Sequence, residues 1–326
     1  MRIGPWRVER ELGRGGMATV YAVVHARFGK RAAVKLAHRA VLGPQFTSET
    51  FLREARMANL INHAGVAEVF ATGTYDGRPY LAMERLTGRS LGARLEDGPL
   101  PRVEALEILG ELCSVLAAAH AAGVTHRDVK LDNVFLLDEP GPGGRRTKLL
   151  DWGMARVTGE DDPLRGLIAG TLTYVAPEQF RSEDIAPAAD IYSLAVLAHL
   201  LLLGQAPFTA STDIDLIHCH LRDAPPSPRK LWAAIPAELE ATLVAMLAKQ
   251  PGDRPAIAEV ARALRNARDR LRPRMLRWLA PPPVAQPRDV LGRPAVPVLA
   301  TRPTRIAGAA LGFALTVVSV LQLLSA

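Results

Sequence analysis

The chain has 326 residues, a net charge of +7 and 48% hydrophobic residues. This length and hydrophobic content suit a folded protein with a large core and exclude a disordered or collagen-like chain. Only two cysteines, Cys113 and Cys219, are present, which argues against a disulfide framework or a cysteine-based metal site and suits a reducing cytosol.

Residue patterns along the chain predict strands first and helices afterwards. Residues 6–40 alternate apolar and polar side chains between turn glycines, as antiparallel strands do. A helix capped by Ser48 is expected over 47–61, and a buried strand over 80–86. Further helices are expected over 102–122, 187–204, 234–249 and 255–271. The predicted fold class is therefore α+β, with a β-rich part followed by a helical part.

A glycine-rich stretch lies in the first of these parts. It reads LGRGGMATVY at residues 12–21, between two predicted strands. Glycines carry no Cβ atom, so backbone N–H groups there can close over the phosphates of a nucleotide. By itself a pair of glycines is weak evidence for a nucleotide site.

The strongest chemical signal is HRDVKLDN at residues 126–133, followed by DWG at residues 151–153. Phosphoryl transfer needs aligned reactants and compensated negative charge more than it needs covalent help from the protein. Asp128 is expected to orient and deprotonate a substrate hydroxyl, and Lys130 to neutralise the γ-phosphate. Asn133 and Asp151 are expected to hold the Mg²⁺ ions that bridge the phosphates.

Taken in chain order with AVK at 33–35 and APE at 176–178, these motifs resemble the protein kinase superfamily. The short motifs MATVY, APEQ and DIYSL are similar to those of bacterial eukaryotic-like serine/threonine kinases. The resemblance implies a two-lobed kinase domain over 1–271, with an N-lobe at about 1–86 and a C-lobe at about 87–271. It also implies ATP with Mg²⁺, or Mn²⁺ in its place, and protein substrates with Ser or Thr.

The resemblance assigns roles around the nucleotide. Lys35 would hold the α- and β-phosphates, and Glu54 would be the carboxylate partner of that lysine. Met83 would gate the back of the adenine pocket, and backbone groups of 84–86 would hydrogen-bond the adenine edge. The other nucleotide-binding residues that it implies are Leu12, Gly13, Arg14, Gly15, Gly16, Ala18, Val20, Ala33, Glu84, Leu86 and Phe135.

Several further features are similar to serine/threonine kinases rather than tyrosine kinases. Lys130 stands two residues after the catalytic aspartate, where tyrosine kinases have other residues. Thr171 precedes the APE motif, and in the family this position hydrogen-bonds the catalytic aspartate and lysine. The resemblance also implies that Asp190 ties a C-lobe helix to the catalytic loop and that Arg254 pairs with Glu178.

Trp152 departs from the family, which usually has Phe in this position. In the family this ring belongs to a column of apolar side chains whose assembly accompanies the active state. The column usually takes Leu one turn after Glu54, where this chain has Ala58. A larger ring beside a smaller partner conserves volume, which cores tolerate. We expect Trp152 to fill that space and to favour the inward position of helix 47–61; a neutral exchange is the alternative.

The activation segment departs from the family as well. Residues 159–169 contain no Ser, Thr or Tyr, whereas many members dock a phosphate from this stretch on the arginine that is Arg127 here. Glu160, Asp161 and Asp162 offer fixed charge instead, although one carboxylate replaces a phosphate only in part. We expect a kinase that is not switched on by phosphorylation there, with an acidic residue or nothing opposite Arg127. A solvated acidic loop is the alternative.

Composition changes abruptly after residue 271. Residues 272–305 contain eight prolines, seven arginines and one acidic residue, which predicts a semi-stiff linker. Its charge suits anionic lipid headgroups better than nucleic acid, because aromatic residues are not interleaved with the arginines.

The last stretch, residues 306–326, contains no charged residue and is long enough for a helix across the ~30 Å hydrocarbon core. Arg302 and Arg305 precede it, so the positive-inside bias predicts a single-pass anchor in the cytoplasmic membrane with the kinase domain in the cytoplasm. A buried or an interfacial helix is the alternative. Gly308 and Gly312 have the spacing of close helix pairs, so a homodimer is one option.

The sequence also bears on two other classes of function. A pseudokinase or membrane scaffold commonly loses Lys35, Asp128, Asn133 or Asp151, and this chain has all four. A small-molecule phosphotransferase of kinase-like fold would not need the arrangement of Thr171 and APE that shapes a peptide platform. The sequence therefore favours a membrane-anchored serine/threonine kinase that transfers the γ-phosphoryl group of Mg·ATP to protein hydroxyls.

Overall fold

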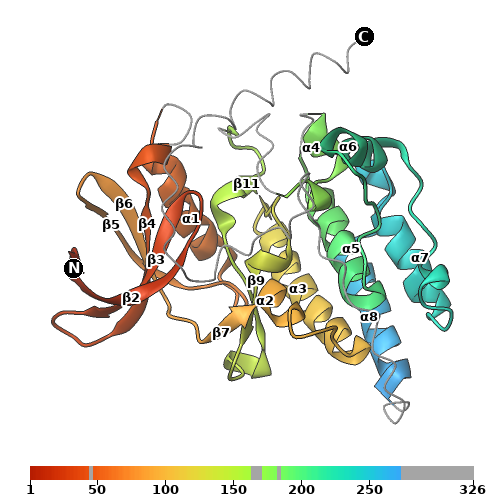
Figure 1. Ribbon diagram of the computed structural model, residues 1–326, viewed down its shortest axis with the longest axis horizontal. Coiled ribbons are helices and arrows are strands. Elements are labelled where there is room, and N and C mark those ends of the chain that lie inside the picture. The colour runs from red at the N-terminus through yellow and green to blue at the C-terminus, as the bar shows by residue number, and fades with distance from the viewer. Residues whose placement is uncertain (44–46, 163–170, 182–184, 273–326) are drawn as a thin grey trace.

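The computed structural model describes residues 1–43, 47–162, 171–181 and 185–272. A β-rich N-lobe and a helical C-lobe lie side by side, with the N-terminus at the far end of the N-lobe (Figure 1). The linker after Arg272 and the span expected over 306–326 lie outside the described residues. Within those residues, no helix has both the length and the apolar character that a membrane crossing requires.

The N-lobe is built on one antiparallel sheet with the strand order β1-β2-β3-β4-β6-β5. Its strands are β1 (Arg2–Ile3), β2 (Trp6–Arg14), β3 (Ala18–His25), β4 (Arg31–Ala37), β5 (Val69–Tyr75) and β6 (Arg78–Met83). The helix α1 (Ser48–Ile61) packs against β5 and β6, and its buried side includes Phe51 and Ala55. Thr47, rather than the predicted Ser48, caps α1, because its hydroxyl accepts the Thr50 N–H at 3.2 Å.

The C-lobe consists mainly of helices. They are α2 (Leu91–Leu95), α3 (Arg102–Ala121), α4 (Pro177–Phe180), α5 (Ala188–Leu203), α6 (Asp213–Arg222), α7 (Ala237–Met246) and α8 (Ile257–Leu271). Short strands complete it: β7 (Gly88–Ser90), β8 (Val124–Thr125), β9 (Val134–Leu137), β10 (Thr147–Leu149) and β11 (Arg156–Val157). The helix expected over 234–249 is shorter at both ends, since it begins after Pro236 and has its C-cap at Leu247.

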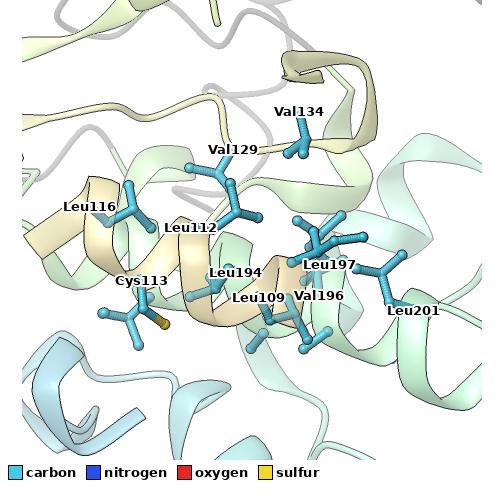
Figure 2. Packing of buried hydrophobic residues seen from close by; sticks show 14 of the residues in the cluster. Leu109, Leu112, Cys113, Leu116, Val129, Val134, Leu194, Val196, Leu197 and Leu201 are labelled. Carbon is cyan, nitrogen blue, oxygen red and sulfur yellow. The ribbon is translucent and has the colours of Figure 1, made fainter. Parts of the chain in front are cut away.

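The core of the C-lobe lies between α3 and α5. Leu109, Leu112 and Leu116 of α3 lie among Leu194 and Leu197 of α5 and the residues around them (Figure 2). Every residue of α5 from Ala189 to Leu203 is buried, so this helix forms the centre of the C-lobe. It supports the catalytic loop at residues 126–133. Burying so much apolar surface is the main stabilising term of the lobe.

The two cysteines differ in their surroundings. Cys113 lies in the core between α3 and its neighbours, and burial raises the pKa of its thiol to about 12. Cys113 is therefore a small buried hydrophobe rather than a reactive thiol. Cys219 on α6 is only partly buried.

Candidate active site

The catalytic loop joins β8 to β9 and presents Asp128 with its two predicted neighbours. Lys130 Nζ donates to Asp128 Oδ2 at 2.7 Å, and Asn133 Nδ2 donates to the same oxygen at 2.9 Å. Asn133 Nδ2 also donates to the Asp128 carbonyl at 2.8 Å. Within the described residues Asp128 Oδ1 has no hydrogen-bond partner, so this oxygen can accept a proton from a substrate hydroxyl.

The backbone of this loop is held by hydrogen bonds to α5. Asp190 of α5 accepts the His126 N–H at 2.9 Å and the Arg127 N–H at 2.8 Å, as the resemblance predicted. Arg127 has a φ of +71°, a conformation that costs an ordinary side chain free energy and persists where neighbouring groups hold it. His120 Nε2 lies 2.8 Å from Asp190 Oδ2 and gives the buried carboxylate another partner.

The lysine of β4 bridges two carboxylates. Lys35 Nζ lies 2.7 Å from Glu54 Oε2 on α1 and 2.9 Å from Asp151 Oδ1. The predicted Lys35–Glu54 pair is therefore confirmed, and α1 stands in the inward position that active kinases require.

The pKa values of this trio follow from burial and charge together. Burial alone would lower the pKa of Lys35, but the carboxylates of Asp151 and Glu54 outweigh it and raise that pKa. Lys35 in turn lowers the pKa of Asp151 to about 2, so this carboxylate is ionised at neutral pH. Burial raises the pKa of Glu54 in spite of Lys35.

Asp151 and Asn133 offer oxygen ligands suited to Mg²⁺. The side chain of Asp151 is 49% exposed and uses Oδ1 on Lys35, while Asn133 uses only its amide nitrogen on Asp128. The Asn133 carbonyl accepts the Leu150 N–H at 2.7 Å, which brings the two residues onto adjacent segments. The described residues contain no cluster of three or more His, Cys, Asp or Glu side chains fit for a metal. Mg²⁺ typically takes one or two protein ligands and completes its shell with water and substrate phosphates, so this pair fits.

The glycine-rich hairpin connects β2 and β3 and begins the predicted nucleotide site. Gly15 N–H donates to the Ala18 carbonyl at 2.9 Å, and a Cβ added at Gly16 would meet nothing within 4 Å. Ala18 is 4% exposed and packs in one cluster with Phe51. The sequence did not reveal His38, whose ring nitrogens lie 2.8 Å from Thr19 Oγ1 and 3.2 Å from the Gly16 carbonyl.

Residues 84–87 connect the two lobes, and their backbone offers adenine fewer hydrogen-bond donors than predicted. The Glu84 N–H already donates to the Glu68 carbonyl at 2.9 Å, and the Glu84 carboxylate pairs with Lys148 of β10. Of its two backbone groups, Glu84 therefore has only its carbonyl left to offer the adenine edge. Met83 pairs with Ala33 across β6 and β4, at the end of the strand that leads into this connection, and its predicted role as a gate stays a prediction.

Two further predicted site residues, Phe135 and Thr171, lie in the C-lobe. Phe135 lies in β9, paired with Ser90 of β7, beneath the connection between the lobes. Thr171 directly precedes the short helix Leu172–Tyr174, and within the described residues its hydroxyl makes no hydrogen bond to Asp128 or Lys130. Lys130 instead pairs with Asp128, so the predicted contact of Thr171 is absent from this conformation.

The acidic residues of the activation segment are bound by arginines. Arg127 Nη1 donates to Asp162 Oδ1 at 3.2 Å, and Arg127 Nη2 donates to Asp162 Oδ2. Glu160 accepts from Arg56 of α1 at 3.0 and 2.5 Å, with Arg53 3.9 Å away. An acidic residue does stand opposite Arg127, as predicted, and residues 163–170 lie outside the described part of the chain.

Trp152 occupies the space behind the catalytic loop. It is 3% exposed and shares the main core cluster with Ala58 of α1. Its ring centroid lies 4.4 Å from that of His126, and its indole N–H donates to the Leu149 carbonyl at 3.1 Å. Phenylalanine would lack this donor and would fill less of the space next to Ala58.

Replacing Trp152 by Phe is expected to lower the free energy of unfolding by about 1–3 kcal/mol, from one lost hydrogen bond and an unfilled cavity. It should also lower phosphate transfer, because α1 is then less well held inward. Calorimetry and a transfer assay test both effects. Trp232→Phe, at a buried C-lobe position with Arg102 over its ring, is the matched control and should lower stability alone. Unchanged stability and activity in Trp152→Phe would contradict the expectation.

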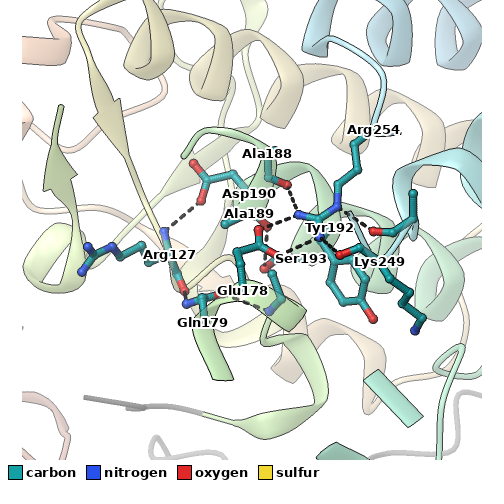
Figure 3. Close-up of polar contacts among 12 residues, drawn as sticks. Arg127, Glu178, Gln179, Ala188, Ala189, Asp190, Tyr192, Ser193, Lys249 and Arg254 are labelled. Carbon is teal, nitrogen blue, oxygen red and sulfur yellow. Dashed lines mark hydrogen bonds and ion pairs between the residues drawn. The ribbon is translucent and has the colours of Figure 1, made fainter. Parts of the chain in front are cut away.

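The buried ion pair of the C-lobe completes the predicted frame. Arg254 donates to Glu178 at 2.6 and 2.7 Å, with both side chains at most 1% exposed (Figure 3). Arg254 also donates to the carbonyls of Ala188 and Ala248 at 2.8 and 2.9 Å, so this buried charge is well satisfied. The pair fixes the end of the activation segment to the helical frame.

Comparisons with known proteins agree with this geometry. A family model described as the protein kinase domain matches residues 6–264. Serine/threonine-protein kinase Pkn1 of Myxococcus xanthus is 38% identical over 269 residues, which are 82% of this chain and 38% of Pkn1. PknH of Mycobacterium tuberculosis is 35% identical over 257 residues, which are 78% of this chain and 40% of PknH.

A solved structure gives the same result. The kinase domain of Mycobacterium tuberculosis PknI matches with a TM-score of 0.63 and 27% identity, covering 82% of this chain and 97% of that domain. The chain spans about half or less of the length of curated relatives such as Pkn1 and pkn3 of Myxococcus xanthus. With its fold, its catalytic loop and these matches in agreement, the chain belongs to the protein kinase family and groups with bacterial serine/threonine kinases.

Proposed function

We propose that the chain is a serine/threonine protein kinase that transfers the γ-phosphoryl group of Mg·ATP to protein hydroxyls. The observation that carries this proposal is the assembled polar centre, in which Lys130 and Asn133 orient Asp128 while Lys35 joins Glu54 to Asp151. A kinase that is inactive by design has no need to hold all of these groups in place.

The residues divide the work as follows. Asp128 orients the substrate hydroxyl and takes its proton on Oδ1 as the hydroxyl oxygen bonds to the γ-phosphorus. The bond from this phosphorus to the β–γ bridging oxygen breaks, and ADP leaves. Lys130 lies next to this carboxylate and can neutralise charge on the transferred group. Lys35 binds the phosphates that remain on the nucleotide, and the free oxygens of Asp151 and Asn133 would hold Mg²⁺. The metal, when bound, compensates the charge of the phosphates.

Phosphate transfer by the full chain tests the proposal directly. The protein is incubated with Mg·ATP and a generic basic protein, and phosphosites are identified by mass spectrometry. We expect phosphate on Ser and Thr and none on Tyr. ATP binding without any transfer, both in detergent and in lipid vesicles, would overturn the proposal and favour a scaffold.

We also propose that the kinase is active without phosphorylation in residues 159–169. The support is that Asp162 already occupies Arg127, the arginine on which an activation-segment phosphate would dock, while Glu160 pairs with Arg56 of α1. The pair of Arg127 and Asp162 is buried, at 4% and 9% side-chain exposure, so solvent screens it little.

A third part of the proposal concerns the membrane. We propose that residues 306–326 anchor the kinase to the cytoplasmic membrane and that the basic linker contacts anionic headgroups, as the sequence indicates. The full chain is expected to stay in the membrane fraction after a high-salt wash, whereas a chain ending at residue 305 should be released. A shortened chain that resists the same wash, or a full chain that is washed off, would contradict the anchor.

A further inference from the structure

The carboxamide of Gln179 connects the peptide-platform side of the C-lobe to the catalytic loop. Its Nε2 donates to the Arg127 carbonyl at 3.2 Å, and its Oε1 accepts the Ala176 N–H at 3.0 Å (Figure 3). These two contacts also set the orientation of the amide, because a flipped amide would place like groups together at both ends. Gln179 stands in α4, directly after Glu178 of the buried ion pair.

The carbonyl that Gln179 binds belongs to the peptide group directly before the catalytic base. The other end of this peptide group is the Asp128 N–H, which donates to His126 Nδ1 at 3.2 Å. The preceding N–H, that of Arg127, is held by Asp190 at 2.8 Å. Gln179 is therefore the side chain that fixes the peptide oxygen at the residue with the left-handed φ of +71°.

We infer that Gln179 is a positioning residue that sets the direction of the Asp128 side chain through the Arg127–Asp128 peptide group. Without the amide donor, the Arg127 carbonyl lies in a residue that is 6% exposed and has lost its partner, which is costly in free energy. Rotating this peptide group toward another donor moves the Asp128 carboxylate with it. A displacement of about 1 Å in a catalytic group can lower a rate about a hundredfold.

The same contacts give the inference a regulatory consequence. The Ala176 N–H lies where the activation segment enters α4, so the order of the segment and the position of the base depend on one amide. This inference rests on the proposed kinase activity and adds a residue to its machinery.

Gln179→Glu separates the two contacts of the amide. The introduced carboxylate can still accept the Ala176 N–H, but it cannot donate to the Arg127 carbonyl. We expect kcat to fall about tenfold or more, with KM for ATP within about twofold and the melting temperature lowered by only a few degrees, as one lost buried hydrogen bond predicts. Lower pH should raise the activity ratio of variant to parent, because a protonated carboxyl can again donate a hydrogen bond.

Hydrogen exchange supplies a readout that needs no turnover. The amides of residues 126–128 are expected to exchange faster in Gln179→Glu than in the parent. Glu259→Gln is the matched control, since Glu259 accepts the Ala256 N–H at 3.0 Å at the start of α8 and forms no recorded hydrogen bond or ion pair with the described residues of the catalytic loop. It should change neither exchange at 126–128 nor kcat.

The two readouts keep the inference and the proposed function apart. If the parent transfers no phosphate, the proposed function fails, and exchange alone decides whether Gln179 fixes the loop. With an active parent, faster exchange together with lower kcat supports the inference. Unchanged exchange at 126–128, or kcat within twofold of the parent, would overturn it and leave Gln179 as a helix cap.

Discussion

Replacing Asp128 by Asn is expected to lower kcat by about 10²–10⁴-fold while ATP binding persists. The exchange keeps the size of the side chain and one oxygen that can accept from Lys130. In the parent, Lys130 Nζ lies 2.7 Å from Asp128 Oδ2. What it removes is the ability to take the proton of the substrate hydroxyl and the negative charge that pairs with Lys130. The rate should fall far more than KM for ATP, because the nucleotide contacts proposed for Lys35 and Asp151 do not involve Asp128.

The measurement compares single-turnover phosphate transfer by the parent and the variant, together with ATP affinity by calorimetry. Asp138→Asn is a suitable control because it makes the same change of charge at an exposed residue after β9. We expect its kcat to match that of the parent. A variant at Asp128 that retains more than about a tenth of the parental kcat would show that proton abstraction by this carboxylate is not needed.

Much of the active site could be predicted because its chemistry is concentrated in short motifs. Asp128, Lys130 and Asn133 lie within six residues, so the loop that brings one of them to the site brings all three. The pair of Lys35 and Glu54 was predicted from family resemblance alone, and the 2.7 Å contact confirms it. The helices of the C-lobe were predicted well where they are long and apolar, as α3 and α5 are.

The missed features depend on contacts between distant segments. His38 reaches the glycine-rich hairpin because β3 and β4 pair with Ala18 opposite Ala37, a register that sequence alone does not reveal. The ten-residue α6 was not predicted, because Asp, His and Arg interrupt its apolar pattern and its Thr212 cap was not recognised. The Glu84 N–H donates to the Glu68 carbonyl, 16 positions earlier in the chain, and this contact removes a donor that the resemblance had offered to adenine.

Replacing Asp162 by Asn is expected to lower kcat/KM for a peptide substrate about ten- to a hundredfold. Arg127 is 4% exposed in its side chain, so loss of its counter-charge leaves a buried guanidinium unpaired. The activation segment can relieve this only by moving away and admitting water. Because a factor of ten corresponds to about 1.4 kcal/mol, a loss of about 1.5–3 kcal/mol from this pair accounts for the expected range.

The control for this prediction is the neighbouring residue. Asp161→Asn makes the same change of charge at an exposed position that forms no ion pair with the residues that the structure describes, so its kcat/KM should stay within about twofold of the parent. Phosphatase treatment of the parent should leave the activity unchanged, since the carboxylate at Asp162 is permanent where a phosphate is removable.

Glu160→Gln should give a smaller loss, because Arg56 is 58% exposed and water can replace that partner. Equal activity of the Asp162 and Asp161 variants, or an activating phosphate on Thr158 or Thr173, would show that another contact orders the segment.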